Sequence, residues 1–121
     1  MSHKLKMYIR NDSSHPLKSY SVSHTWNDHT NNLNGENLAI SQLSRSQEIT
    51  SGYNEHDWYT VQLTFADTDS SSKQTDFYCD SSHSEKVVTL YIHDDYLDCA
   101  YSEEIGDPDK HSSSCNKKHW T

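Results

Sequence analysis

The sequence is poor in the residues that usually build a protein interior. Only 31% of its 121 residues are hydrophobic, and Leu, Ile, Val and Phe together fall below the roughly 20% at which disorder becomes a realistic outcome. Eight tyrosines and three tryptophans offset this shortage, because each can bury roughly 150–250 Å² and keep a polar tip. The length excludes two full domains, since domains usually contain about 100–150 residues. We therefore expect one small ordered domain.

Long apolar segments are missing as well. No run approaches the ~20 apolar residues that span a bilayer, and residues 1–6 lack the apolar stretch of a signal peptide. The chain is therefore predicted to be leaderless and cytoplasmic, with unconventional secretion as the alternative. Three cysteines, an odd number, favour reduced thiols with a mainly structural role over a disulfide framework.

Basic residues are few. Ten lysines and arginines stand against eighteen acidic residues, which gives a net charge of −8. Because this charge repels phosphate backbones and anionic lipid, we expect no nucleic-acid partner. Membrane contact is expected only through a specific lipid headgroup.

The clearest pattern in the chain is the alternation of apolar and polar side chains, which is typical of half-buried strands. It predicts strands at 4–10, 18–26 and 58–65, and shorter ones at 38–42, 47–53 and 75–79. Within the first of these, Leu5, Met7 and Ile9 share the inward face.

Residues 86–101 predict a β-hairpin. With Asp94 and Asp95 as a two-residue loop, the apolar side chains of the two arms pair on one face. The expected pairs are Ile92 with Leu97, Leu90 with Cys99 and Val88 with Tyr101. Both residues of a type I′ turn need a positive φ, so a longer loop is the alternative.

Polar segments separate the predicted strands, at 11–16, 27–37, 66–74 and 80–85. Several short strands without a helical period predict an all-β fold, an antiparallel β-sandwich of about seven to nine short strands. Residues 1–105 are expected to form this sandwich domain. Residues 106–121 have almost no apolar side chain before Trp120 and are expected to form a polar C-terminal tail, mobile or loosely docked.

Motifs of known catalytic sites are absent. The sequence contains no G-x-S-x-G, no H-E-x-x-H and no P-loop, so we predict no enzyme and assign no catalytic residue. Two C-x3-H spacings, Cys79 with His83 and Cys115 with His119, are compatible with zinc ligands. Such matches arise often by chance in a His-rich chain, so we predict no metal and no cofactor.

The most suggestive cluster lies at 53–59, in the run Tyr-Asn-Glu-His-Asp-Trp-Tyr. A sugar ring offers apolar C–H faces and hydroxyl groups, so its site needs an aromatic platform beside planar donors and acceptors. By alternation Trp58 faces away from the inward side of its strand, whereas Trp26 shares the inward face with Tyr20. Packing in the core is the alternative for both tryptophans. The candidate ligand-binding residues are Tyr53, Asn54, His56, Asp57 and Trp58.

A row of hydroxyl groups forms a second signal on the outer face of residues 18–26. It consists of Ser19, Ser21, Ser23 and Thr25. Such a row can bind polyols, form an edge that pairs with a second subunit, or simply be the solvated face of a strand. The solvated face is favoured, because antiparallel sheets commonly expose one face to water.

The layout of these segments resembles that of the aegerolysin-like β-sandwich proteins and their PUD-type relatives. The similarity rests on residues 8–11 (YIRN), 52–61 (GYNEHDWYTV) and 77–79 (FYC), and it spans positions 7–101. It implies a small leaderless sandwich, in a family where some members recognise membrane lipids or other surface molecules and others have no settled role. It assigns no lipid-contacting residue to a position of this chain.

These features together predict a non-enzymatic recognition module, a lectin-like protein that binds a glycan or glycoconjugate through loop aromatics and Asn, Asp and His side chains. A homo-oligomer is expected, because single sugar sites are weak and multivalency adds up to roughly 10²–10⁴ in avidity. One alternative is a structural or interaction protein of the cytosol that forms a homodimer. The other is an aegerolysin-like protein that binds a lipid headgroup.

Overall fold

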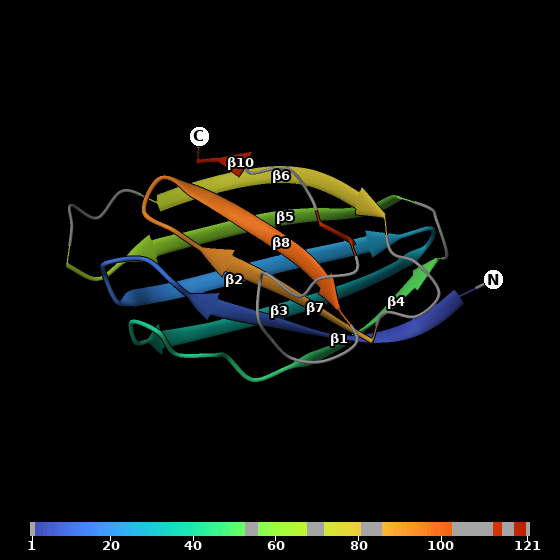
Figure 1. Ribbon diagram of the computed structural model, residues 1–121, viewed down its shortest axis with the longest axis horizontal. Coiled ribbons are helices and arrows are strands. Elements are labelled where there is room, and N and C mark those ends of the chain that lie inside the picture. The colour runs from blue at the N-terminus through green and yellow to red at the C-terminus, as the bar shows by residue number, and fades with distance from the viewer. Residues whose placement is uncertain are drawn as a thin grey trace.

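The chain folds into two stacked β-sheets (Figure 1) in a computed structural model that describes residues 2–52, 56–67, 72–80, 86–102, 113–114 and 118–120. No helix within these ranges is long and apolar enough to cross a membrane. The strands are β1 (Ser2–Asn11), β2 (Leu17–Trp26), β3 (His29–Leu38), β4 (Gln47–Gly52), β5 (His56–Phe65), β6 (Ser72–Asp80), β7 (Val87–Ile92), β8 (Tyr96–Ser102), β9 (Ser113–Ser114) and β10 (Lys118–His119).

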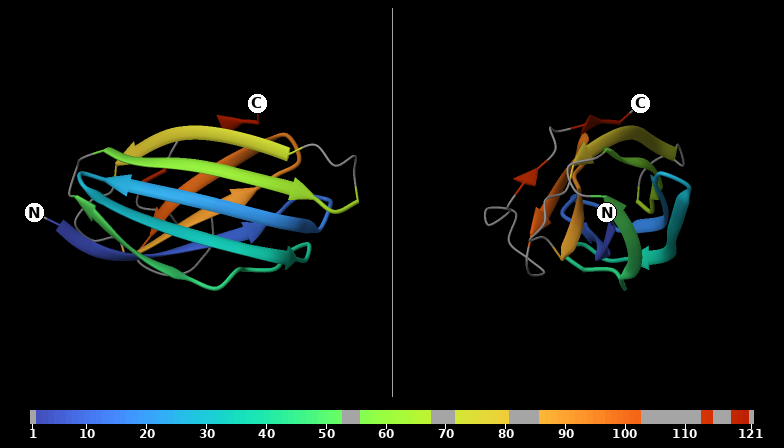
Figure 2. Two further views of the ribbon diagram at one scale, coloured as in Figure 1. Left: turned by 180° about the vertical axis from the view of Figure 1, so that it is seen from behind. Right: turned by 90° about the vertical axis from the view of Figure 1, so that its right-hand side faces the viewer.

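The predicted two-sheet, all-β fold is confirmed. Sheet A has the strand order β10-β8-β7-β1-β4, with β9 also paired to β8, and sheet B has the order β3-β2-β5-β6. Sheet B is antiparallel, whereas sheet A is mixed because β1 and β7 run parallel. The end-on view in Figure 2 shows the two sheets curving around a shared interior. The parallel pair joins strands that are far apart in sequence, so no local pattern indicates it.

The three alternating segments fold as predicted. In β1 the inward residues Leu5, Met7 and Ile9 are at most 1% exposed, while Lys4 and Lys6 face solvent. Each fully buried apolar side chain of this size stabilises the fold by about 1.5–3 kcal/mol relative to exposure. The inward residues of β2 and β5 complete the layer from sheet B: Leu17, Tyr20, Val22, Tyr59, Val61, Leu63 and Phe65.

The hairpin of β7 and β8 has the predicted register, which pairs Val88 with Tyr101, Leu90 with Cys99 and Ile92 with Leu97. Neither Asp94 nor Asp95 is among the non-glycine residues with a positive φ, so the tight turn is not type I′. The turn is held by two hydrogen bonds that Ser14 donates to the Asp94 carboxylate, one from its backbone N (2.8 Å) and one from its Oγ (2.7 Å). These hydrogen bonds lower the pKa of Asp94 and tie the loop after β1 to the hairpin.

Two predictions between residues 27 and 42 are wrong. The segment 27–37, predicted as a polar loop, holds most of strand β3, and the segment 38–42, predicted as a strand, has none beyond Leu38. The reason is that β3 is an edge strand that buries only Leu33 and Leu38 of its ten side chains. With so few apolar residues, no alternation marks it in the sequence.

A two-residue turn joins β2 to β3. Trp26 pairs with His29, which leaves Asn27 and Asp28 as the loop. Asn27 has a φ of 56°, a left-handed conformation that asparagine tolerates better than most residues. The Asn-Asp dipeptide after a clear strand was the available signal for this hairpin.

The described part of the predicted tail is docked on sheet A. Residues 118 and 119 pair with Leu97 and Tyr96 of β8. Trp120 packs against the core, and its Nε1 donates to the His93 carbonyl oxygen at 3.0 Å. Residues 118–120 therefore pack beside the turn of the β7–β8 hairpin.

The expectation of reduced, mainly structural thiols is wrong for Cys79 and confirmed for Cys99. Cys79 forms a disulfide bond, whereas Cys99 is a free thiol buried between the sheets. Burial raises the pKa of the Cys99 thiol well above its usual value, with repulsion from Asp57 and Asp98 adding to the effect. Cys99 therefore stays a neutral core residue.

Candidate functional site

The outward side chains of sheet B form a regular lattice, because the registers of β2 and β5 keep outward residues opposite one another. All sixteen positions are exposed or half-buried. Fourteen are uncharged and two, Glu36 and Asp76, are acidic. Across β3, β2, β5 and β6 the four rows are Thr30–Thr25–Trp58–Tyr78, Asn32–Ser23–Thr60–Asp76, Asn34–Ser21–Gln62–Gln74 and Glu36–Ser19–Thr64–Ser72.

The hydroxyl row of β2 lies in the middle of this lattice. Because β2 is hydrogen-bonded to β3 on one side and β5 on the other, the row is not a free edge. Pairing of β2 with a second subunit, one reading of its hydroxyl row, is therefore wrong. The row is instead a side-chain surface flanked by further hydroxyl and amide groups.

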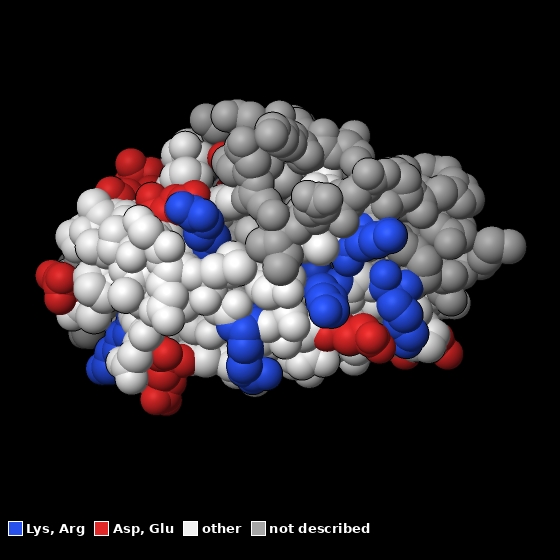
Figure 3. Space-filling view, turned by 60° about the horizontal axis from the view of Figure 1, so that its bottom comes forward, with Lys and Arg blue, Asp and Glu red and all other residues white. Residues whose placement is uncertain are grey.

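The lattice positions carry no lysine or arginine, although basic residues lie near them: Lys18 is on β2, Lys73 is on β6, and Arg45 Nη2 donates to the Asn34 carbonyl oxygen at 3.1 Å. Figure 3 shows lysine and arginine side chains interspersed with acidic ones on the face that it brings forward. On β1, Lys4 lies 3.8 Å from Glu48 of β4, and Arg10 forms an ion pair with Asp12 at 2.6 Å. The sheet B lattice, by contrast, holds no cation at any of its sixteen positions.

Three exposed rings form an aromatic patch at one corner of the lattice, which we define as His56, Trp58 and Tyr78. Trp58 is 54% exposed and Tyr78 51% exposed. Their ring centroids are 5.0 Å apart, and the His56 ring lies 4.2 Å from Tyr78 and 6.0 Å from Trp58. Large aromatic side chains usually bury such area, so a pair that stays half exposed offers an apolar platform to a ligand.

A hollow of about 500 Å³ adjoins this patch. It is lined by Thr25, Trp26, Asn27, His56 and Trp58, and we call it the aromatic hollow. Its lining is mainly polar and includes aromatic side chains, a hydroxyl and an amide. This is the combination of chemical groups that a polyol with C–H faces requires.

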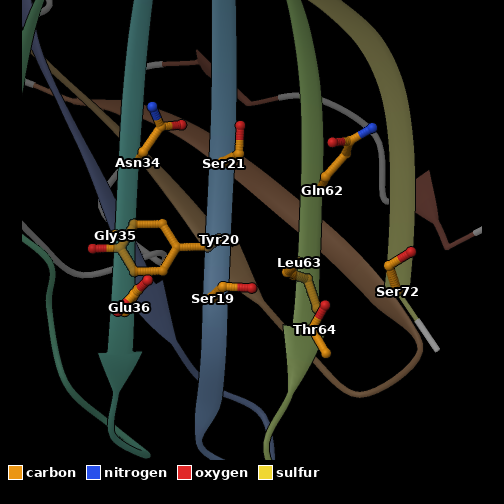
Figure 4. A pocket seen from close by; sticks show the side chains of 10 residues that line it. All are labelled: Ser19, Tyr20, Ser21, Asn34, Gly35, Glu36, Gln62, Leu63, Thr64 and Ser72. Carbon is orange, nitrogen blue, oxygen red and sulfur yellow. The ribbon is translucent and has the colours of Figure 1, made fainter. Parts of the chain in front are cut away.

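A second hollow, of about 490 Å³, lies at the other end of the same face. Figure 4 shows the amides of Asn34 and Gln62 on either side of Ser21, with Glu36 and Ser19 in the neighbouring row. We call it the polar hollow. Its remaining lining residues are Tyr20, Gly35, Leu63, Thr64 and Ser72.

The floor of the polar hollow depends on a close approach between Tyr20 and Gly35, which are paired across β2 and β3. A Cβ placed on Gly35 would overlap the Tyr20 hydroxyl oxygen, so the tyrosine ring occupies the space of the missing side chain. Any larger residue at 35 would displace this ring.

A buried polar network lies directly beneath the aromatic patch. Asp57 Oδ1 accepts from His24 Nε2 at 3.1 Å, and Asp57 Oδ2 accepts from Ser51 Oγ at 2.7 Å and from Tyr101 OH at 3.0 Å. The Tyr59 hydroxyl lies 2.6 Å from that of Tyr101 and donates to it, since the Tyr101 proton is directed to the carboxylate. All five residues are at most 2% exposed.

The hydrogen bonds of this network fit a structural role and differ from those of a nucleophilic triad. The Ser51 hydroxyl donates to the Asp57 carboxylate, whereas a nucleophilic triad places the serine on the imidazole. His24 and Asp57 belong to sheet B, and Ser51 and Tyr101 belong to sheet A, so the network clamps the two sheets together. Because Trp58 follows Asp57 on the same strand, the clamp fixes the backbone under the aromatic patch, which favours a preformed binding surface.

Of the sequence-predicted site residues, the structure brings together His56 and Trp58. Tyr53 and Asn54 lie outside the described residues. Asp57 points to the opposite side of β5, where it is fully buried, so it positions the strand rather than lining the surface.

Tyr78 does not stand out as a site residue in the sequence, although one signal is present. It lies between Phe77 and Cys79, which are both buried, so alternation places it on the outward face. Its position beside Trp58 depends on the pairing of β5 with β6, which no local pattern reveals. The burial of Trp26, at 8% exposed, agrees with the inward face predicted for it.

The described residues contain no cluster of three or more His, Cys, Asp or Glu side chains that could hold a metal ion. Of the two C-x3-H spacings, Cys79 is engaged in its disulfide, and His83 and Cys115 lie outside the described residues. His119 is exposed on β10.

We expect the buried tyrosines to make the fold less stable at alkaline pH. Burial is the largest cause that raises the pKa values of Tyr59 and Tyr101 well above the usual 10.0. The unfolded chain ionises these phenols near that pH, whereas the folded chain keeps them neutral. Their contribution to the free energy of unfolding is therefore complete below pH ~10 and is lost as the pH rises further. We expect the free energy of unfolding to fall by up to ~1.4 kcal/mol per pH unit for each tyrosine.

Urea unfolding between about pH 9 and pH 11 measures this slope. The Tyr59→Phe variant should show a shallower decline than the parent chain, and the exposed-site variant Tyr78→Phe should show the parent's decline. Equal slopes in the parent and Tyr59→Phe would contradict the assignment.

No protein-family model matches the chain, and no curated protein sequence matches it. The function is therefore inferred from the side chains of the site.

Proposed function

We propose that the protein is a non-enzymatic, lectin-like module that binds glycans on the outer face of sheet B. The main observation behind this proposal is the half-exposed pair Trp58 and Tyr78, whose ring centroids lie 5.0 Å apart beside the aromatic hollow. Ring faces bind the C–H side of a sugar, and the Thr25 hydroxyl and the Asn27 amide offer both donors and acceptors to its hydroxyl groups.

The absence of lysine and arginine from the sixteen lattice positions supports a glycan over the lipid-headgroup alternative. A phosphate-bearing headgroup is normally held by Arg or Lys or by a cluster of backbone N–H groups. The sheet B lattice has no basic side chain, and the chain as a whole carries a net charge of −8. A cytosolic interaction protein, the other alternative, would bury the aromatic patch against a partner chain.

Binding of the intact protein to a glycan array, with liposome flotation in parallel, tests the proposal. We expect binding to neutral glycans and none to neutral or anionic phospholipid vesicles. Oligomeric state, measured by light scattering on the same sample, should reveal a homo-oligomer that supplies the avidity of weak sites. An array without signal would overturn the proposal; vesicle binding would then favour headgroup recognition, and dimerisation without ligand an interaction protein.

A further inference from the structure

We propose, on the basis of the glycan-binding function above, that the site extends from the aromatic patch to the polar hollow and takes a linear, uncharged polysaccharide chain rather than a single terminal sugar. Both hollows open on the outer face of sheet B. They lie at opposite ends of the same β2–β5 pair, with Thr25 and Trp58 at one end and Ser19 and Thr64 at the other.

The separation of the hollows sets the size of the ligand. From Thr25 to Ser19 there are six residue steps along β2, which is about 20 Å at ~3.4 Å per residue. A monosaccharide is too small to reach both ends. The row between them carries Ser23 and Thr60 on β2 and β5, and Ser21 and Gln62 of the next row already line the polar hollow, so hydroxyl and amide groups continue along these two strands from one hollow to the other.

The side chains of this face favour a neutral glycan as the ligand. Hydroxyl and amide groups both donate and accept, as the hydroxyl groups of a neutral sugar do. The two carboxylates, Glu36 and Asp76, accept from sugar hydroxyls and repel anionic ligands. A protein partner fits less well, because protein interfaces are depleted in serine and place their aromatic anchors near the centre, whereas these aromatic rings lie at one corner.

The backbone hydrogen bonding of β2 and β5 also favours a glycan over a peptide. β2 and β5 are interior strands whose main-chain groups are engaged within the sheet, so an extended peptide cannot add to them as a further strand. Only side chains are available on this face. A chain of sugar rings, bound through rings at one end and hydrogen bonds along its length, uses the whole surface.

Isothermal titration with ladders of linear neutral oligosaccharides tests the inference. The probes are gluco-, manno- and N-acetylglucosamine oligomers from disaccharide to hexasaccharide, each with a sulfated counterpart. We expect the hexasaccharide of the recognised ladder to bind at least about ten-fold more tightly than its disaccharide. The sulfated form should bind more weakly than the neutral one.

A variant of the polar hollow separates its role from that of the aromatic patch. Asn34→Ala combined with Gln62→Ala removes two exposed amides from this hollow, and Gln47→Ala removes a matched amide from sheet A. The double variant should lower hexasaccharide affinity to that of the disaccharide and leave disaccharide affinity within about two-fold, with an unchanged melting temperature. Gln47→Ala should bind as the parent does.

The outcomes distinguish the inference from the function on which it rests. Equal affinity for disaccharide and hexasaccharide, or a double variant that binds both as the parent does, would overturn the extended site while glycan binding stands. Array hits confined to branched or anionic glycans would overturn it as well. The absence of any glycan binding would overturn the proposed function itself.

Discussion

The Asp57→Ala variant is expected to lose about 3–5 kcal/mol of stability, a large part of what a small domain possesses. Asp57 is fully buried and accepts hydrogen bonds from His24, Ser51 and Tyr101. Removal of its carboxylate leaves three buried donors without their acceptor, and each such group costs roughly 1–3 kcal/mol. His24 Nδ1 already has no hydrogen-bond partner among the described residues, so loss of the carboxylate would leave both ring nitrogens of this buried histidine without a partner.

Urea denaturation of Asp57→Ala against the matched variant Asp76→Ala measures this cost. Asp76 lies on the exposed face of β6 in the same sheet, so its loss should change stability by no more than about 0.5 kcal/mol. Similar midpoints for the two variants would show that the buried network does not clamp the sheets.

Replacement of the two tryptophans is expected to separate binding from folding. Trp58→Ala should weaken glycan binding by about thirty-fold or more, as the loss of an aromatic anchor does. Because Trp58 is 54% exposed, the same change should cost about 1 kcal/mol of stability or less, the scale of an aromatic pair contact. Thermal unfolding and glycan titration on one preparation give both values.

Trp26→Ala is the matched control for stability alone, because Trp26 also lines the aromatic hollow. Trp26 is 8% exposed and packs over Gly52, where an added Cβ would overlap its Nε1. Its truncation opens a cavity between β2 and β4 and should cost about 3–5 kcal/mol. If Trp58→Ala unfolds the chain to the same degree, Trp58 is a core residue and the aromatic patch is not a binding surface.

Much of the fold was predictable because its strands carry a period-two pattern. β1 and β5 bury every second side chain, as does β2 from Tyr20 to Trp26, and the alternation of β5 alone is enough to place Trp58 outward and Tyr59 inward. The β7–β8 hairpin was predictable to the residue pair, because only one register brings the apolar side chains of both arms to one face.

Other features depend on contacts that a single sequence does not display. Strand β3 forms at a sheet edge through backbone pairing with β2 and needs few apolar residues to do so. The parallel pairing of β1 with β7 is set by how the two sheets close around the interior. Asp57 has the polar character of a surface residue, and it lies inside because of its partners: His24 on the neighbouring strand, and Ser51 and Tyr101 across the core.

The resemblance to aegerolysin-like proteins stays a prediction at the level of layout. The two-sheet architecture is what the resemblance implies, and many unrelated proteins share such sandwiches. The proposed binding surface on sheet B rests on its own side chains and on none of that family's contacts.

Mapping of amide chemical-shift changes by NMR, on addition of a saturating neutral oligosaccharide, tests the binding face most directly. The largest shifts should fall on Thr25, Trp58 and Tyr78, with smaller ones along β2 and β5, while the amides of β1 and β4 in sheet A stay unchanged. Shifts concentrated on sheet A, or spread evenly over the molecule, would contradict the assignment of the site.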